Sequence, residues 1–379
     1  MRWSAHPDAF VRRRLTVVRD HGRVSGGPGK LSGLGGDTEL AGLATAMAVP
    51  EAADDDPPPA EPLAALAAEY GLREAAARPP ILGYIKDLWQ RRHFIVGFAT
   101  ARNVAMYTEA RLGQVWQVLT PLLNAAVYYL IFGVILGTKR GIPDFIGFLV
   151  AGVFIFNFTQ RSFIIASRVI NDSLPLIRAL YFPRAALPLG YVLIELEQLM
   201  VSMVVLVIIV LAAGEPLTWY WLLVLPVLLL QAIFNVGAGL ILARIGAGVD
   251  DVSQLLPFVV RTWMYASGVM FSIQTLNSLT KHHKLAYILQ VNPAAVYITL
   301  VRTALLKSQR LSIPGAAPYN HRLCALYYNE PAKHLYDSAH CAALVSHTDL
   351  WLYAVGWAIL ALVIGFFYFW RAEARYGRG

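Results

Sequence analysis

Six long apolar runs constrain this chain more than any other feature. They cover approximately residues 117–137, 145–166, 186–213, 219–243, 254–273 and 350–370. Each run has about 20 residues or more, which is the length that a helix needs to cross a hydrocarbon core of about 30 Å. Hydrophobic residues make up 57% of the chain and charged residues only 15%. The sequence therefore predicts an all-α integral membrane protein with six transmembrane helices.

Basic residues near the ends of these runs indicate their orientation. Basic residues precede the first run, lie between the second and third runs, and follow the last run. In that order they are Lys86, Arg91, Arg92, Arg102 and Arg111, then Arg168, Arg178 and Arg184, then Arg371, Arg375 and Arg378. The loop at 214–217 has no basic residue. Because cytoplasmic loops are enriched in Lys and Arg, both termini are expected in the cytoplasm. The net charge of +8 is thus assigned to topology rather than to nucleic-acid binding.

The chain before the first run divides into two kinds of sequence. Residues 1–78 are rich in Gly, Ala, Pro, Asp and Arg, a composition expected to form a disordered cytoplasmic tail. They contain no apolar signal-peptide segment, so the first span is expected to direct insertion. Within 79–115, apolar residues such as Tyr84 and Trp89 recur at helical spacing among charged residues. This pattern favours an amphipathic helix at the membrane interface over a cytosolic helix packed on its own protein.

The chain lacks the sequence motifs of a nucleotide-binding phosphate loop and of a metal site. The nearest match to a phosphate-binding loop, Gly26 to Lys30, is followed by Leu31 where a magnesium-binding hydroxyl is needed. The histidines at 282, 283 and 340 have no metal-ligand spacing. We therefore expect no catalytic residue, metal or cofactor on this chain.

Three motifs, in order, resemble one family. They are Leu112-Gly113 with Trp116 and Pro121, then Tyr181-Phe182-Pro183-Arg184 after a short helix, then Asn292-Pro293 followed by Arg302. Across residues 80–370 they resemble ABC-2 type permeases that export polysaccharides. The chain departs from that pattern in having Tyr107, Thr108 and Arg111 ahead of Leu-Gly, where the family often has a basic residue and Ser or Thr. Its 274–349 segment is also longer than usual.

The resemblance implies a transport subunit in a bacterial cytoplasmic membrane. Two copies of the chain would form a homodimer, and two copies of a separate ABC ATPase, carrying ATP and Mg²⁺, would drive it. The substrate class would be a lipid-linked glycan of the O-antigen, teichoic acid or galactan type. Segment 274–349 would lie outside with re-entrant helices between spans five and six, and 350–379 would hold span six and a cytoplasmic tail. Spans one to five would occupy 116–273.

A cytoplasmic helix at 171–181 is the expected contact for the ATPase. Its candidate contact residues mix charge with apolar side chains: Asp172, Leu176, Ile177, Arg178 and Tyr181. Transient interfaces have this mixed character. The alternative is a loop helix that lies on the membrane.

The Leu-Gly turn is the expected place for the substrate headgroup. Arg111 offers a planar fork for phosphate oxygens, and Gly113 allows close backbone approach. Leu112 and Trp116 complete this candidate group. The alternative is a positively charged anchor followed by a flexible hinge.

A polymer conduit would suit flat aromatic side chains inside the spans. The candidates are Tyr128, Phe132, Trp263, Tyr265 and, as a buried acid, Glu195. The alternative for the aromatic residues is helix packing. For Glu195 and Glu197 it is structural pairing with Arg161 or Arg261, because a bundle interior needs its charges compensated.

The two cysteines, Cys324 and Cys341, both fall in the expected outer loop. An oxidising compartment permits a disulfide between them, against the alternative of two free thiols. Two other functions stay open at this point. One is an ABC-2 permease for drugs or small lipids, and the other is an integral membrane glycosyltransferase. For the latter, Asp250-Asp251 is the adjacent aspartate pair beside a span, without the flanking motif of such enzymes.

Overall fold

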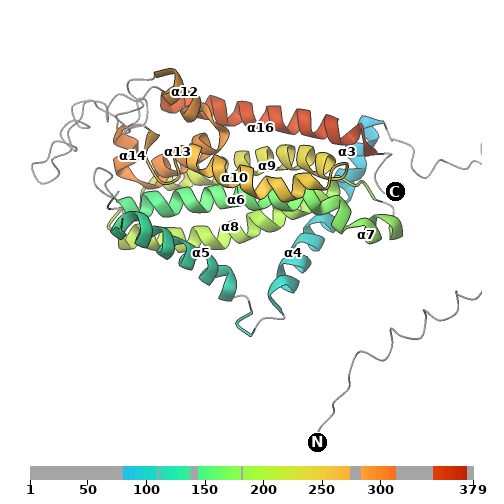
Figure 1. Cartoon of the computed structure of the whole chain (residues 1–379), viewed down its shortest axis with the longest axis horizontal. Helices are drawn as coiled ribbons and strands as arrows, with labels where there is room; N and C mark the ends of the chain where they lie inside the picture. Colours follow the sequence, from blue (N-terminus) through green and yellow to red (C-terminus); the bar gives the residue numbers. More distant parts are fainter. Residues whose placement is uncertain are drawn as a thin grey trace, which may run out of the picture. The chain divides into compact units, whose positions relative to one another are not determined.

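The computed structural model is helical wherever it describes the chain. It describes residues 80–108, 111–113, 115–135, 137, 144–180, 182–273, 283–312 and 345–373, all within one compact unit, Glu74–Gly379. In these ranges there is no strand, so the expected all-α class is confirmed (Figure 1). The elements in chain order are α3 (Ile81–Gln90), α4 (Arg92–Thr108), α5 (Val115–Tyr128), the π-helical segment η2 (Tyr129–Ile135), α6 (Phe145–Asp172), α7 (Leu174–Ala179), α8 (Ala186–Ala212), the 3₁₀ segment η3 (Trp219–Leu223), α9 (Val224–Gly246), α10 (Asp251–Ala266), α12 (His283–Val291), α13 (Pro293–Leu305), α14 (Lys307–Ser312) and α16 (His347–Trp370).

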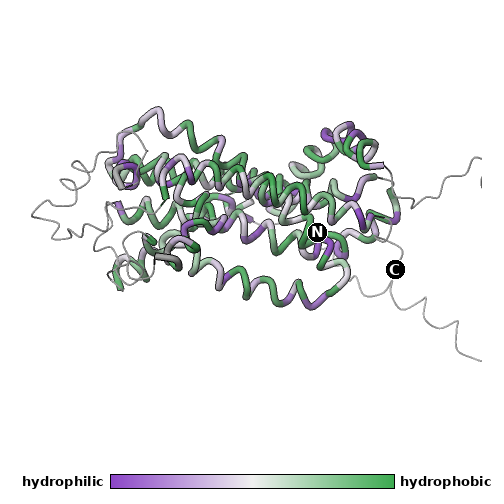
Figure 2. Tube along the Cα trace, turned by 90° about the horizontal axis from the view of Figure 1, so that it is seen from above, coloured by the Kyte–Doolittle hydropathy of each residue, from purple (hydrophilic) through white to green (hydrophobic). Residues whose placement is uncertain are grey.

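Five helical segments are long and apolar enough to cross a bilayer. They are Val115–Ile135, Phe145–Asp172, Ala186–Ala212, Trp219–Gly246 and His347–Trp370. They agree with five of the six apolar runs to within a few residues at most ends. Hydrophobic residues predominate along these segments (Figure 2).

The apolar run at 254–273 does not form a full span, which corrects the prediction of six. Its helix, α10, has 16 residues, so it is about 24 Å long and short of a hydrocarbon core of about 30 Å. The helix ends at Ala266 with Ser267 as its C-cap, and Gly268 then turns the chain with φ of +65°. Among the described residues the count of candidate spans is therefore five.

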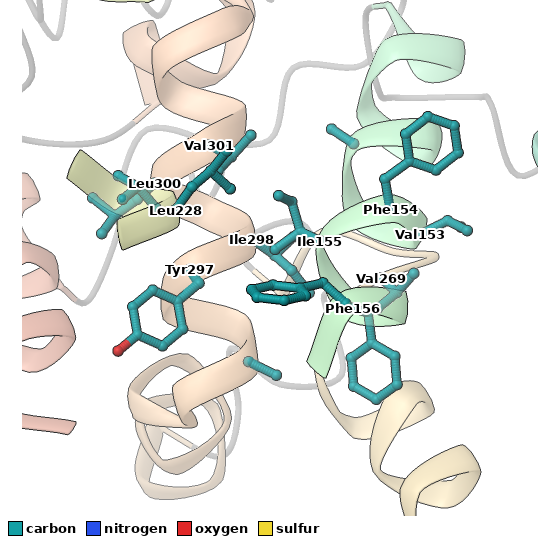
Figure 3. Packing of buried hydrophobic residues seen from close by; sticks show 14 of the residues in the cluster. Val153, Phe154, Ile155, Phe156, Leu228, Val269, Tyr297, Ile298, Leu300 and Val301 are labelled. Carbon is teal, nitrogen blue, oxygen red and sulfur yellow. The ribbon is translucent and has the colours of Figure 1, made fainter. Parts of the chain in front are cut away.

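Helix α6 lies at the centre of the bundle and α5 at its edge. In the most apolar stretch of each helical segment, 72% of the residues are buried in α6 but only 11% in the α5–η2 segment. Helix α6 packs against α8, α9, α10 and α13. Figure 3 shows Ile298 of α13 beside Ile155 and Phe156 of α6. The apolar outer face of α5 is thus available to lipid or to another protein.

Helices α9 and α16 approach each other backbone to backbone. A Cβ atom on Gly237 of α9 would overlap the backbone of Ala361 and Leu362, and one on Gly365 of α16 would overlap the backbone of Gly237. Small residues permit such close approach between membrane helices, where dispersion and shape rather than water exclusion drive packing. These two glycines therefore determine how closely α9 and α16 pack.

The two ends of the bundle differ in their elements. Helices α3 and α7 lie at one end, and α12, α13 and α14 at the other (Figure 1). At the latter end Arg302 is 4% exposed and donates to three carbonyl oxygens: Phe148 at 2.9 Å, Gly268 at 2.8 Å and Val269 at 2.6 Å. This arginine therefore ties α13 to the first turn of α6 and to the turn that ends α10.

Candidate functional site

Helices α4, α5, α6 and α8 surround a pocket with many polar lining residues. Aromatic rings and uncharged polar side chains line it beside one acid and one base. The lining residues are Tyr107, Trp116, Gln117, Thr120, Pro121, Asn124, Phe154, Asn157, Phe158, Arg161, Glu195, Gln198, Leu199 and Ser202. Three of the four helices belong to the candidate spans, so much of this polar surface lies among apolar segments. Polar groups are costly in that setting, and such positions commonly mark a substrate path.

Hydrogen bonds connect the walls of the pocket. The Arg161 guanidinium on α6 donates to the Gln198 side-chain oxygen on α8 at 2.9 Å. The amides of Gln198 and of Gln117 on α5 both donate to the side-chain oxygen of Asn103 on α4, at 3.4 and 3.2 Å. One α4 residue therefore links to both α5 and α8.

Glu197 of α8 joins the same hydrogen-bond network on the side of the helix that faces α4. Its two carboxylate oxygens accept hydrogen bonds from Thr100 and Asn103 of α4, each at 3.0 Å. Glu197 therefore fastens α4 to α8. It is not among the residues that line the pocket.

Glu195 faces the pocket and is 4% exposed. It lies within electrostatic range of Arg161, whose guanidinium donates its hydrogen bond to Gln198. On the α4 side, burial raises the pKa of the Tyr107 hydroxyl, which keeps it neutral and able to donate. The pocket thus offers a guanidinium, a carboxyl group, a hydroxyl and several amides within one volume.

The turn that carries the expected headgroup residues joins α4 to α5. Arg111 and Leu112 are exposed, and Gly113 has φ of +50°, a left-handed conformation that glycine adopts without strain. The Trp116 N–H then donates to the Gly113 carbonyl oxygen at 3.4 Å. Of the four candidates, Trp116 lines the pocket, and the other three form the turn just before it.

The conduit candidates separate into two groups. The rings of Tyr128 and Phe132 stack with centroids 6.4 Å apart, and Tyr128 lies within electrostatic range of Tyr265 and Arg261 of α10. Trp263 packs elsewhere: its ring stacks on Phe163 at 5.8 Å between centroids. Tyr128, Phe132 and Tyr265 therefore lie in one region, whereas Trp263 belongs to the interior packing.

Helix α7 presents two different sides. Ile177 is 8% exposed and packs in the apolar cluster at this end of the bundle, and Leu176 lies partly buried against it. Arg178 and Leu180 are exposed, as is Asp172 at the end of α6. Tyr181, Cys324 and Cys341 lie outside the described residues. An incoming protein would meet the Arg178 and Leu180 side of α7.

Three amide side chains in and beside the pocket were missed from the sequence. The amides Asn103, Gln117 and Gln198 make hydrogen bonds between helices, whereas the sequence pointed to ionisable and aromatic residues inside the spans. The sequence signal that could have found these residues is an uncharged amide side chain inside an otherwise apolar or amphipathic helix. Of the Asp250-Asp251 pair, Asp250 accepts a hydrogen bond from Asn171 at 2.8 Å, which joins the end of α6 to the start of α10.

Taken together, these features define a multi-pass membrane protein whose helices surround a polar pocket. A model of the ABC-2 type transporter family matches residues 96–306, and the chain belongs to that family. This membrane domain has no ATPase domain of its own, which implies a partner ATPase, and it indicates no cofactor site on the chain.

Relatives with described functions agree with this assignment. An O-antigen export system permease protein of Myxococcus xanthus is 26% identical over 234 residues, which is 62% of this chain and 87% of the relative. Two O-antigen export system permease proteins of Klebsiella pneumoniae are 24% and 23% identical over 218 residues, 57% of this chain and 79% of each relative. At a coarse level these similarities support polysaccharide export.

Proposed function

We propose that this chain is the permease subunit of an ABC exporter for a lipid-linked polysaccharide in a bacterial cytoplasmic membrane. A homodimer of the chain would associate with two copies of a separate ATPase, with both termini in the cytoplasm. The observation that carries the proposal is the polar pocket between α4, α5, α6 and α8. Its amides suit sugar hydroxyls, and the rings of Trp116, Phe154 and Phe158 suit the apolar faces of sugars.

The position of the Leu-Gly turn supports lateral access from the bilayer. The lipid tail of such a substrate stays in the membrane, so the headgroup must reach the protein at the interface. Arg111 lies in the turn between α4 and the first span, directly before the pocket residue Trp116. A phosphate held at Arg111 would leave the attached sugars close to the pocket.

The exposed faces of α5 and α10 support assembly of two copies. Leu122 and Val127 of α5 and Phe258 of α10 are exposed in the single chain. Tyr128 and Tyr265 lie in the same region. A second copy that covers this surface would place aromatic rings from both chains along the shared boundary.

Reconstituted transport tests the proposal. The chain, purified together with its ATPase, is placed in vesicles with lipid-linked glycan extracted from the source membrane. We expect ATP to make the glycan inaccessible to an added glycosidase, with no such change without ATP or with a non-hydrolysable analogue. Movement of apolar dyes without glycan movement would instead identify a small-molecule efflux permease. Glycan movement that does not depend on ATP would also contradict the proposal.

Arg111→Ala is expected to lower export and glycan-stimulated ATP hydrolysis. A lost charge-assisted hydrogen bond of about 1.5–3 kcal/mol corresponds to about tenfold to hundredfold weaker substrate binding. Arg111→Lys should recover only part of this loss, because an ammonium group lacks the bidentate fork. The measurement is the glycan concentration that gives half-maximal ATPase stimulation. Arg102→Ala, at another exposed arginine ahead of the first span, is the control. Equal effects at both positions would show that the turn acts only as a topological anchor.

A further inference from the structure

Three residues that are far apart in the sequence meet at the α3 and α7 end of the bundle. They are Tyr84 of α3, Arg184 before α8 and Glu373 after α16, and we refer to them as the inner clamp. Tyr84 is 1% exposed and Glu373 is 6% exposed. The Tyr84 hydroxyl donates to one carboxylate oxygen of Glu373 at 2.9 Å. The Arg184 N–H donates to the other carboxylate oxygen at 3.0 Å.

The inner clamp supplies the N-terminal cap of α8. This helix has no side-chain cap from its own N-cap residue, Ala185. Instead the Ala185 N–H donates to the Tyr84 hydroxyl at 3.0 Å, and the Arg184 N–H is taken by Glu373. A carboxylate at a helix N-terminus also interacts favourably with the helix dipole. The Arg184 guanidinium in turn donates to the Glu373 carbonyl oxygen, which fastens the segment after α16.

This arrangement does more than a local cap would do. A serine or aspartate at position 185 could satisfy an N–H group and leave α3 and α16 independent of α8. Here the cap comes from residues 101 and 189 positions away. Apolar contacts reinforce the same link, because the Tyr84 ring lies 5.9 Å from the Phe366 ring and Ile177 of α7 belongs to the same cluster. The start of α8 is therefore joined to α3 and to the segment after α16 by hydrogen bonds and by apolar packing.

We propose that the inner clamp transmits movement of α7 to the interfacial helices, so that ATP hydrolysis and substrate access occur together. The inference rests on the proposed function, in which α7 contacts the ATPase. Tyr84 and Glu373 act as positioning residues and do not touch substrate. Helix α3 continues into α4, which borders the polar pocket, so a displacement at Tyr84 reaches the side of the pocket where the headgroup would arrive.

Separate measurement of export and ATP hydrolysis tests the proposal. Tyr84→Phe keeps the ring and removes the hydroxyl, so both hydrogen bonds are lost. In the complex with its ATPase, we expect the amount of glycan moved per ATP hydrolysed to fall about fivefold or more. The rate of ATP hydrolysis should stay within about twofold of that of the original complex. Glu373→Gln keeps one of the two acceptor oxygens and replaces the other by an amide NH2, so one of the two hydrogen bonds can remain and the glycan moved per ATP should fall less. Tyr191→Phe, the same change at a ring that packs in the same cluster, is the control.

A purely structural role gives a different result. In that case the melting temperature falls, and export and hydrolysis fall in proportion, with an unchanged ratio. That outcome, or a ratio equally reduced in the Tyr191→Phe control, would overturn the proposal. If the original complex moves no glycan with ATP, the proposed function itself fails.

A second measurement needs neither ATPase nor glycan. Spin labels at Leu82→Cys on α3 and Ala179→Cys on α7 report the distance between these helices in the purified chain, with Cys324 and Cys341 replaced by serine. Leu82 is 83% exposed and Ala179 is also exposed, so labels can be attached. We expect a narrow distance distribution that broadens with Tyr84→Phe but not with Tyr191→Phe. Equal widths in all three proteins would show that the clamp does not link the helices.

Discussion

Replacing Gly237 by leucine is expected to abolish the folded protein. A Cβ atom at this position would overlap the main chain of Ala361 and Leu362, which cannot move aside as a flexible side chain can. The helices would have to separate, and α9 and α16 would lose the contacts of their closest approach. Overpacking commonly costs about 1–3 kcal/mol, and a clash with backbone is expected to reach or exceed the upper end of that range. Gly365→Leu should fail similarly, since its Cβ would meet the backbone of Gly237.

The measurement is the yield of monodisperse protein after detergent extraction, together with its melting temperature. Gly356→Leu is a matched control on α16, because nothing lies within 4 Å of the position of its Cβ atom. We expect that control to express and melt like the original protein. Normal yield and melting temperature for Gly237→Leu would show that α9 and α16 are not packed as described.

Combining Arg178→Glu with Leu180→Glu is expected to detach the ATPase and to stop ATP-driven export. Both residues lie on the exposed side of α7, where the mixture of a cation and an apolar side chain suits a protein partner. Arg178→Glu reverses a charge, and Leu180→Glu introduces a carboxylate where an apolar side chain stood. Charge repulsion and the cost of desolvating the new carboxylate would then both weaken binding of the ATPase. Co-purification with the ATPase and glycan export in vesicles are the two measurements.

Two further variants separate loss of the partner from loss of the fold. Arg178→Lys keeps the charge and should retain the ATPase. Ile177→Glu places a carboxylate in the buried cluster beneath α7, so it should lower the melting temperature of the chain itself. A double variant at 178 and 180 that still co-purifies with its ATPase would place the coupling surface elsewhere.

The spans were predictable from the sequence to the extent that hydropathy determines them. Five apolar runs became long helices, because a run of about 20 apolar residues satisfies its backbone hydrogen bonds in a bilayer by forming a helix. The predicted span at 254–273 was longer than the helix that forms there, because a hydropathy pattern contains no information about a turn. Gly268 with its positive φ ends α10, while Arg302, 34 positions later, donates to the Gly268 carbonyl oxygen and stabilises that turn. A contact between distant residues of this kind has no local signal.

The site was predictable only in part for a similar reason. Ionisable residues inside spans drew notice, and Glu195 and Arg161 do lie together in the pocket. Arg161 lies within electrostatic range of Glu195, and its guanidinium donates to the Gln198 side-chain oxygen at 2.9 Å. Which side of α7 is buried also depends on the cluster formed by α3, α6, α8 and α16. The sequence of a six-residue helix contains little information about that choice.

The glycine contact between α9 and α16 has a consequence for how the molecule can work. Main chains that touch cannot slide past each other without separating, so α9 and α16 are expected to move together as one unit. Movement relative to this pair is then expected in the less buried helices, α5 with its π-helical end and the short α10. Both carry exposed apolar faces, so the part of the machine that moves is also the part expected to meet the second copy. Gating and dimerisation would therefore share one surface, and a change that tightens the dimer should slow the cycle.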